Sequence, residues 1–361
     1  MRHILVTGGA GFIGSNFVHY LLQSEPDVHI INLDALTYAG SLENLKDLPD
    51  PSRHVFIHGD ITDQGMVDRI FAEYGIDTVV HFAAETHVDR SILDPGAFVQ
   101  TNVIGTFTLL EAARKAWLVD KTVPRDAVRF HHVSTDEVFG TLSKADPPFR
   151  EETAYQPRSP YAASKAASDH FVRAYYTTYG LPISISNCSN NYGPRQFPEK
   201  LIPLMILNAT NGKPLPIYGD GMQIRDWLYV DDHCEALWKV ATQGKVGETY
   251  CIGGDNQPAN IEIVRTICQI LDELQPDSPF TPHEQLMRFV PDRPGHDRRY
   301  DIDISKINSE LGWQPRHDLQ QGLLATVRWY LEHPEWVAAI TQQSDLNSWI
   351  QKNYANRKDQ V

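Results

Sequence analysis

The N-terminal segment constrains the fold of this chain more than any other feature. An apolar run at residues 4–7 leads into a cluster of glycines, and apolar residues at helical spacing follow. Gly9, Gly11 and Gly14 fit the pattern G-x-G-x-x-G, and Gly8 gives the shifted spacing G-x-x-G-x-x-G. Glycines so spaced let the backbone turn tightly and approach a pyrophosphate, and a helix N-terminus offers N–H groups to phosphates. The segment therefore predicts the opening of a dinucleotide-binding α/β fold.

An acidic residue follows these glycines at the spacing of a ribose-binding group. Asp34 ends the next predicted strand, about twenty residues past the last glycine, where a carboxylate holds the adenosine ribose. Because a carboxylate repels a 2′-phosphate, the pattern favours NAD over NADP. A glycine turn beside a solvated aspartate is the alternative. Asp60 and Ile61 end a third predicted strand, where they are placed to hold the adenine, and residues 81–86 end a fourth.

A hydroxyl and two carboxylates follow the apolar run 128–133, at Thr135, Asp136 and Glu137. Such a group at a strand end is typical of a site that moves protons. Neighbouring side chains of a strand point to opposite faces, so both carboxylates reach one substrate only where the strand has given way to a loop. The alternative is a helix cap, since Ser, Thr and Asp commonly start helices.

Tyr161 and Lys165 lie four residues apart in a predicted helix that begins at Ser159 and Pro160. Residues at this spacing share one helix face, so both side chains can address one ligand. A free tyrosine has a pKa near 10, and a nearby ammonium favours the phenolate and lowers that pKa. The pair can then remove a hydroxyl proton while hydride leaves the same carbon. Alone, a Tyr and a Lys at this spacing are more often solvent-exposed residues with no role in a site.

Together these motifs resemble the extended short-chain dehydrogenase/reductase family, and within it the 4,6-dehydratases of thymidine-diphosphate glucose. The resemblance covers residues 1–330 and is carried by TGGAGFIGSNF, AAETHVDRSI, STDEVFG, YAASK, NNYGPRQFPEKLIP, PLPIYGDGMQIRDWLYVDDH and DRPGHDRRYDID. Related GDP-mannose dehydratases and UDP-glucuronate decarboxylases usually carry Ser where this chain has Asp136, and 4-epimerases lack the acid pair. These NAD-dependent enzymes remain the alternative. Thr86, Phe139 and Asn187 depart from the usual pattern.

The resemblance implies a role for each residue of the reaction. Tyr161 deprotonates the glucose 4-hydroxyl as NAD takes hydride from C4, and Lys165 tunes the tyrosine and binds the nicotinamide ribose. Thr135 hydrogen-bonds the 4-oxygen. Glu137, ionised, removes the C5 proton, and Asp136, neutral, protonates the leaving 6-hydroxyl. Hydride returns to C6, which gives a 4-keto-6-deoxy sugar, and NAD is regenerated while tightly bound. Two adjacent carboxyls with opposite tasks need environments that separate their pKa values.

The resemblance also implies two sets of binding residues. The cofactor set is Gly8, Gly11, Phe12, Ile13, Gly14, Asp34, Leu36, Thr37, Asp60, Ile61, Phe82, Ala83, Ala84, Thr101, Tyr161, Lys165 and Asn191. The substrate set is Thr86, Thr135, Asn190, Glu199, Lys200, Leu201, Ile202, Pro216, Ile217, Tyr218, Arg225, Asn260, Asp292, Arg293 and His296. The chain carries a formal charge of −14, so a local basic cluster rather than a global field must bind the diphosphate.

Six predicted strands, near residues 3–7, 28–33, 54–58, 77–81, 128–134 and 183–187, alternate with helical stretches. This order predicts a doubly wound parallel Rossmann sheet with a smaller α/β substrate-binding domain. We expect the NAD-binding domain over residues 1–187, with 225–255 returning to it. The substrate domain spans 188–330, interleaved with the first, and 331–361 form a helical tail.

Composition and patterning restrict the partners. No run of apolar residues is long enough to cross a membrane, and the immediate start of a strand leaves no room for a signal peptide, so a cytoplasmic enzyme is expected. The acidic balance argues against nucleic acid. The histidines and cysteines show no metal-binding spacing. In the family that the chain resembles, helices corresponding to residues 96–117 and 160–179 pair in a homodimer, although core packing is an alternative for some of their apolar positions.

Overall fold

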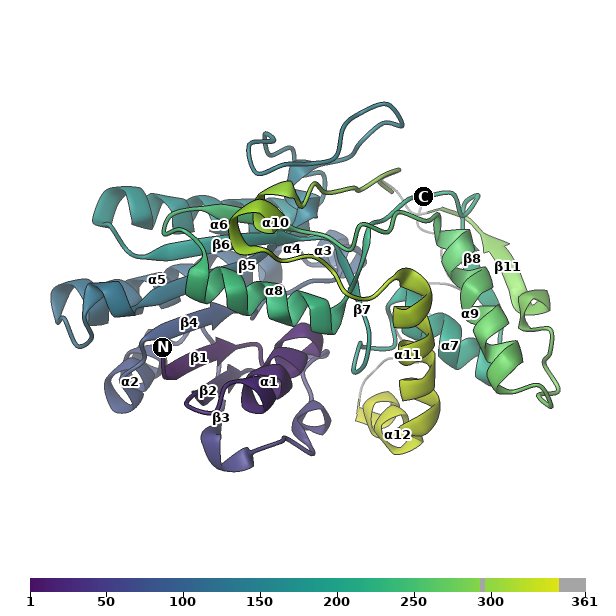
Figure 1. Ribbon diagram of the computed structural model, residues 1–361, viewed down its shortest axis with the longest axis horizontal. Helices are drawn as coiled ribbons and strands as arrows, with labels where there is room; N and C mark the ends of the chain where they lie inside the picture. Colours follow the sequence, from purple (N-terminus) through teal and green to yellow (C-terminus); the bar gives the residue numbers. More distant parts are fainter. Residues whose placement is uncertain (293–295, 344–361) are drawn as a thin grey trace.

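The computed structural model describes residues 1–292 and 296–343. A parallel seven-stranded sheet forms its larger half, in the strand order β10-β6-β5-β4-β1-β2-β3 (Figure 1). The strands are β1 (His3–Thr7), β2 (His29–Asp34), β3 (His54–His58), β4 (Thr78–His81), β5 (Arg129–Thr135), β6 (Ile183–Cys188) and β10 (Thr249–Ile252). The first six lie within a residue or two of their predicted positions, and the predicted parallel sheet is confirmed.

Helices cover both faces of this sheet, and each face has its own apolar core. On one face α1 (Phe12–Ser24) packs against α8 (Val230–Gln243), with α10 (Ser305–Leu311) beside it. On the other face lie α2 (Gln64–Tyr74), α5 (Thr106–Arg114) and α6 (Pro160–Tyr179). Because both faces are covered, all the strands except the edge strand β3 are buried almost throughout, as parallel sheets usually are.

The two long predicted helices differ in regularity. α6 begins where the sequence predicted, with the Ser159 side chain accepting the N–H of Ala162 as an N-cap. The stretch predicted over 96–117 is α4 (Pro95–Phe98), a π-helical segment at Val99–Gly105, α5, and a second π-helical segment at Lys115–Val119. The short α3 (Val88–Leu93) precedes it.

A smaller lobe gathers at the right of Figure 1 around a second core. It holds α7 (Leu201–Thr210), α9 (Asn260–Leu274), α11 (Leu319–Glu332) and α12 (Pro334–Gln343). Two short parallel pairs complete it: β8 (Leu215–Tyr218) with β11 (Met287–Val290), and β7 (Asn190–Tyr192) with β9 (Trp227–Tyr229).

The chain passes between the two halves through β9. Trp227 and Tyr229 pack in the core of the smaller lobe, whereas the alternate residues Leu228 and Val230 pack in the core beside the sheet. From there α8 and β10 lie with the sheet, inside the range 225–255 that was expected to return to it. The domain boundaries themselves stay a prediction. Of the predicted tail, residues 344–361 lie outside the described residues.

Candidate active site

A cavity of about 330 Å³ opens at the carboxyl ends of the central strands. Ligands of doubly wound sheets bind at this edge, where the strand order reverses, which here is between β1 and β4. Residues that follow β1, β2, β3, β4, β5 and β6 line the cavity together with the start of α6. One space therefore collects side chains that lie up to about two hundred positions apart.

The glycine turn after β1 forms one wall of this cavity. Gly8 has a φ of +73°, and a Cβ added there would lie 2.6 Å from the backbone nitrogen of Ala83. A Cβ on Gly14 would lie 2.2 Å from the carbonyl oxygen of Gly8. No side chain caps α1 at Gly11, so the N–H groups of its first turn are left for a ligand in the cavity.

Asp34 ends β2, is largely buried and faces the same cavity. Its two carboxylate oxygens accept the N–H groups of Ala10, at 2.9 Å, and Leu36, at 2.8 Å. Burial raises its pKa, and these two hydrogen bonds oppose that effect. Thus Asp34 fixes the turn after β1 against the turn after β2 while it lines the cavity. Leu36 itself, predicted as a cofactor contact, is not among the lining residues.

The end of β5 satisfies both interpretations of its sequence. Thr135 is the last residue of the strand, and a 3₁₀ turn at Asp136–Phe139 begins immediately after it. The Thr135 hydroxyl accepts the N–H of Glu137 at 3.3 Å, so it caps this turn. Thr135 and Glu137 also line the cavity. The strand gives way where the carboxylates begin, as a shared site requires.

Asp136 lies behind the cavity wall rather than on it, with 2 % of its surface exposed. Burial, together with the neighbouring charge of Glu137, raises its pKa well above the ordinary value. The Thr135 hydroxyl lies 3.4 Å from Oδ1, and Oδ2 is buried without a hydrogen bond from any described residue. A neutral carboxyl is the form that these surroundings favour.

Tyr161 and Lys165 both line the cavity from α6. The predicted lowering of the Tyr161 pKa by Lys165 stays a prediction, because the strongest influences on this hydroxyl come from other groups. Burial and the charge of Glu137 raise the pKa of the tyrosine, while the Thr135 hydroxyl hydrogen-bonds to it and opposes the rise. The ammonium of Lys165 donates to the carbonyl of Val133 at 2.8 Å.

The predicted substrate residues fall into two groups. Thr86, Thr135, Asn190, Glu199 and Lys200 line the cavity. The others do not: Leu201 and Ile202 start α7, Pro216, Ile217 and Tyr218 belong to β8, and Arg225, Asn260, Asp292 and His296 lie beyond. Arg293 lies outside the described residues.

This second group is joined by its own contacts in the smaller lobe. His296 Nδ1 lies 2.6 Å from Asp292 Oδ1, and the amide of Gln223 donates to Asp292 Oδ2 at 2.9 Å. The backbone N–H of Asn260 donates to the Gln223 carbonyl at 2.9 Å. Arg225 donates to the carbonyls of Ile224 and Asp297 and lies over the Tyr300 ring.

Of the predicted cofactor residues, all except Leu36 line the cavity. Sequence reasoning missed several further lining residues, namely Tyr38, Gly40, Glu85, Ser134, Cys188, Ser189, Gln196 and Phe197. Most of them adjoin motif residues, so position beside a strand end was the available signal. Within the described residues, no cluster of three or more metal-ligating side chains occurs, and no helix is long and apolar enough to span a membrane.

The parallel sheet, the glycine turn and the Tyr161–Lys165 pair define a dinucleotide-binding protein of the sugar-nucleotide dehydratase and epimerase class. Residues 5–326 match the family described as GDP-mannose 4,6 dehydratase.

Relatives give a finer assignment. A dTDP-glucose 4,6-dehydratase of Neisseria meningitidis is 57% identical over 338 residues, which cover 93% of this chain and 95% of the relative. The dTDP-glucose 4,6-dehydratase of Bacillus anthracis, solved in complex with NAD, superposes with a TM-score of 0.83 at 46% identity, covering 94% of this chain and 100% of that one. The Streptomyces venezuelae enzyme, also solved with NAD, gives 0.82 at 46% identity, covering 93% and 98%. The chain belongs to the dTDP-glucose 4,6-dehydratase family.

Proposed function

We propose that this protein converts dTDP-glucose to dTDP-4-keto-6-deoxyglucose and water, using NAD, as a step in deoxysugar biosynthesis. One observation carries the proposal: Thr135, Glu137 and Tyr161 line the same cavity as the glycine turn and Asp34. Groups that handle protons therefore share one space with groups that suit a dinucleotide. The activity of the related dTDP-glucose 4,6-dehydratases supports the same reaction.

The residues present fit NAD. The close approach at Gly8 and the uncapped start of α1 leave room and N–H donors for the pyrophosphate. Asp34 presents a carboxylate to the adenosine ribose, and Lys165 and Tyr161 lie at the other end for the nicotinamide ribose. When bound, NAD supplies a hydride acceptor for C4 and later the hydride for C6. Its cationic ring also favours ionisation of Tyr161, which the protein alone opposes.

In the oxidation step, Tyr161 accepts the proton of the 4-hydroxyl as hydride leaves C4. The Thr135 hydroxyl, which hydrogen-bonds Tyr161, is placed to hold the 4-oxygen beside it. The ketone that results acidifies the proton on C5. This step leaves one proton on the tyrosine and a carbonyl at C4.

In the elimination step, Glu137 takes the C5 proton and Asp136 gives a proton to the departing 6-hydroxyl, which leaves as water. The raised pKa of Asp136 supports its role as the acid, because the group is then protonated at neutral pH. Its Oδ2 is buried without a hydrogen bond from the described residues, and Asp136 must move from behind the cavity wall to reach the 6-hydroxyl. Return of hydride to C6 and of the proton from Glu137 to C5 leaves a net loss of one water. The proton that Tyr161 took then replaces the one that Asp136 gave, which restores the site.

The smaller lobe holds the nucleotide in this proposal. Asn260, Asp292 and His296 are joined there through Gln223, Arg225 is a further proposed contact, and Lys200 adds a cation on the cavity wall. A local set of basic and amide groups of this kind answers the need for diphosphate binding in an acidic chain.

We further propose a cytoplasmic homodimer formed through α6 and the segment 99–119. Apolar side chains are exposed along these elements, at Val99, Ile104, Phe107, Phe171, Tyr176 and Tyr179. The rings of Phe107 and Phe171 lie 6.4 Å apart, which joins the two elements into one face. Light scattering of the parent protein should give twice the mass of one chain. The double variant Phe107→Asp/Phe171→Asp should give the mass of a monomer.

Mass spectrometry of the purified protein with dTDP-glucose, without added cofactor, tests the reaction. Loss of one water from dTDP-glucose, with UDP-glucose, GDP-mannose and UDP-glucuronate unchanged, is the expected result. Loss of carbon dioxide from UDP-glucuronate, or of water from GDP-mannose, would instead assign one of the sister activities.

A further inference from the structure

Asp169 is a buried acid that the proposed reaction does not use. It lies on α6 with none of its surface exposed, one helical turn after Lys165, which is 4 % exposed. Residues four apart on a helix share a face. Two groups of opposite formal charge are thus buried on one face of α6, with Lys165 on the cavity wall and Asp169 behind it.

The carboxylate of Asp169 joins the ends of the two strands that carry the site. Its Oδ2 accepts hydrogen bonds from the hydroxyls of Ser134, at 2.9 Å, and Tyr155, at 2.8 Å, and from the amide of Asn187, at 3.3 Å. The same amide also donates to the carbonyl of Thr135 at 3.0 Å. Asp169 therefore holds β5 and β6 at the point where the candidate proton carriers begin.

The histidine nearest to Asp169 acts on it together with Lys165: burial alone would raise the pKa of the Asp169 carboxyl, and the hydrogen bond and charge of His132, followed by the charge of Lys165, hold that pKa below its ordinary value. His132 Nε2 lies 3.1 Å from Asp169 Oδ1. Burial, with the charge of Lys165, lowers the pKa of His132 to about 4, so its ring is neutral at pH 7. A buried charge is costly unless an opposite charge lies near it. Lys165 is the buried cation on the same face of α6, although its ammonium donates to the Val133 carbonyl and not to Asp169 directly.

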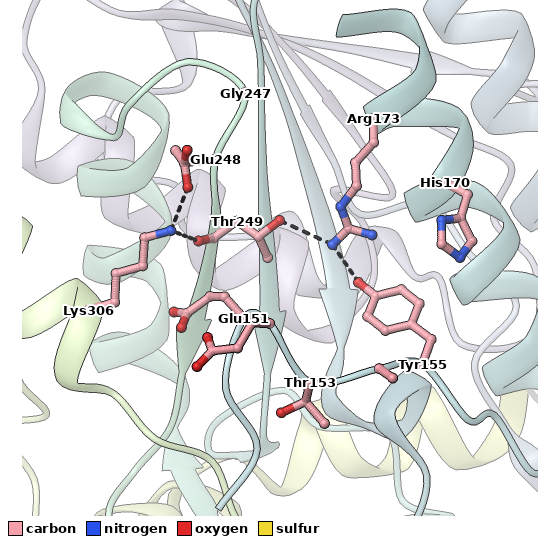
Figure 2. Close-up of a pocket in the computed structure, with 11 residues that line it drawn as sticks. Glu151, Thr153, Tyr155, His170, Arg173, Gly247, Glu248, Thr249 and Lys306 are labelled. Atoms are coloured by element: carbon pink, nitrogen blue, oxygen red, sulfur yellow. Dashed lines mark hydrogen bonds and ion pairs between the residues drawn. The ribbon is translucent and has the colours of Figure 1, made fainter. Parts of the chain in front are cut away.

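The network extends from Asp169 to a second pocket. Arg173, one turn beyond Asp169, donates to the Tyr155 hydroxyl at 2.7 Å and to Thr249 Oγ1 at 3.2 Å. Figure 2 shows this end of the network, with Arg173 directed at Tyr155 and Thr249 in the wall of a second, open pocket. Lys165, Asp169 and Arg173 thus alternate in sign along one face of the helix.

We propose that Asp169 is the counter-ion that keeps Lys165 charged inside the fold, and is therefore a positioning residue of the candidate active site. The part that concerns catalysis rests on the proposed function, whereas the charge pairing is a property of the chain itself. The titratable groups around Lys165 are Tyr161 and Asp169 on α6, His81 on β4, His132 on β5 and Cys188 on β6. Burial lowers the pKa of Lys165, and the charge of Asp169 opposes that change.

The direct test needs neither substrate nor turnover. The full-length protein and its Asp169→Asn variant are labelled briefly with acetic anhydride over a range of pH, and acetylation of the Lys165 peptide is measured by mass spectrometry. We expect the labelling midpoint of Lys165 to fall by about one pH unit or more in Asp169→Asn. Tyr155→Phe, which removes one hydrogen bond from Asp169 but keeps its charge, is the matched control and should leave the midpoint in place. An unchanged midpoint in Asp169→Asn would overturn the proposal.

Turnover of dTDP-glucose adds the catalytic consequence. In Asp169→Asn, kcat should fall as pH rises through the lowered Lys165 midpoint, while KM stays within about twofold because Asp169 does not line the cavity. A protein that shifts the midpoint but turns over none of the four sugar nucleotides would contradict the proposed function and leave the charge pairing intact. If kcat of Asp169→Asn depended on pH in the same way as kcat of the parent, Asp169 would not be a positioning residue.

A second variant decides the matter if Asp169→Asn does not fold. Lys165→Met removes the cation and leaves Asp169 to be buried alone. Because protonation of Asp169 then relieves the cost, the melting temperature of Lys165→Met should approach that of the parent as pH falls from about 8 to about 5. A gap that is constant over this range would show that the two groups are not paired.

Discussion

The same family resemblance predicted two sets of residues, one at the edge of the sheet and one around β8 and β11. In the structure the first set lines one cavity, whereas the second set does not. Residues from six strand ends meet in one cavity, and almost every predicted cofactor residue lies on it. Of the predicted substrate residues of the smaller lobe, Asn260, Asp292 and His296 are joined through Gln223 away from this cavity, whereas the charge of Arg225 still acts on the Asp136 carboxyl. Parallel strands bring their carboxyl ends together by topology, whereas the smaller lobe depends on loops whose meeting no strand order dictates. If the comparison is right, substitutions at the sheet edge change kcat and those in the lobe change KM.

The largest effect is expected at Tyr161. Tyr161→Phe removes the group that accepts the 4-hydroxyl proton, so kcat should fall about 1,000-fold, within the usual range for a lost general base. Tyr176→Phe, on the exposed side of the same helix, should retain the parent rate. Steady-state product formation measures both. If Tyr161→Phe had a normal kcat and a raised KM, Tyr161 would contribute to substrate binding and would not be the group that accepts the proton.

Glu137 comes next, because its loss should affect only the second step. In Glu137→Gln, C4 oxidation continues while removal of the C5 proton slows by about 100-fold or more. Bound reduced nicotinamide should therefore accumulate and be visible by absorbance after mixing with dTDP-glucose. The exposed Glu152→Gln serves as the control. Water loss at the parent rate in Glu137→Gln would show that another group is the base.

Asn260 tests the other side of the comparison. Its Oδ1 is buried without a hydrogen bond from the described residues, so a ligand that bonds it should lose about 1–2 kcal/mol in Asn260→Ala. KM should rise about tenfold with kcat unchanged. Asn211→Ala, in the same lobe at the end of α7, should leave both constants in place. If Asn260→Ala lowered kcat and left KM unchanged, the smaller lobe would not differ from the sheet edge in its kinetic effect.

The smallest effect is one of stability and involves Asp136. Because burial raises its folded-state pKa, the folded protein keeps a proton that the unfolded chain releases above about pH 4. Stability is therefore lost as pH rises from that value towards the folded-state pKa. Asp136→Asn mimics the neutral form, so it should unfold at a higher temperature than the parent at pH 7, with the difference vanishing near about pH 4. Asp27→Asn, at an exposed position, should show no such trend; scanning calorimetry at several pH values measures both.

Much of the sheet edge could be predicted because its signals are local. Alternating apolar runs located β1 to β6, and the Ser159–Pro160 pair located the start of α6. Thr135 shows that two interpretations of one residue can both hold, since it caps a turn and lines the cavity. These features depend on neighbours a few positions away, which a sequence displays directly.

The features that sequence reasoning missed depend on distant contacts. The pKa of Tyr161 rises because the whole site is buried, and burial is a property of the packed fold. Asp169 gathers Ser134, Tyr155 and Asn187 from three separate segments. Nothing in the spacing of these residues predicts that they meet. The placement of Asp136 behind the cavity wall likewise follows from a turn whose geometry only the structure gives.

The alternation along β9 has a consequence for how the molecule melts and how it can be recombined. Trp227 and Tyr229 belong to one core while Leu228 and Val230 belong to the other, so neither half can lose its packing without exposing part of its neighbour. We expect heat to unfold the chain in a single cooperative transition. A chimera that borrows the smaller lobe from a relative would have to import residues 227–230 together with the surfaces on both sides of them.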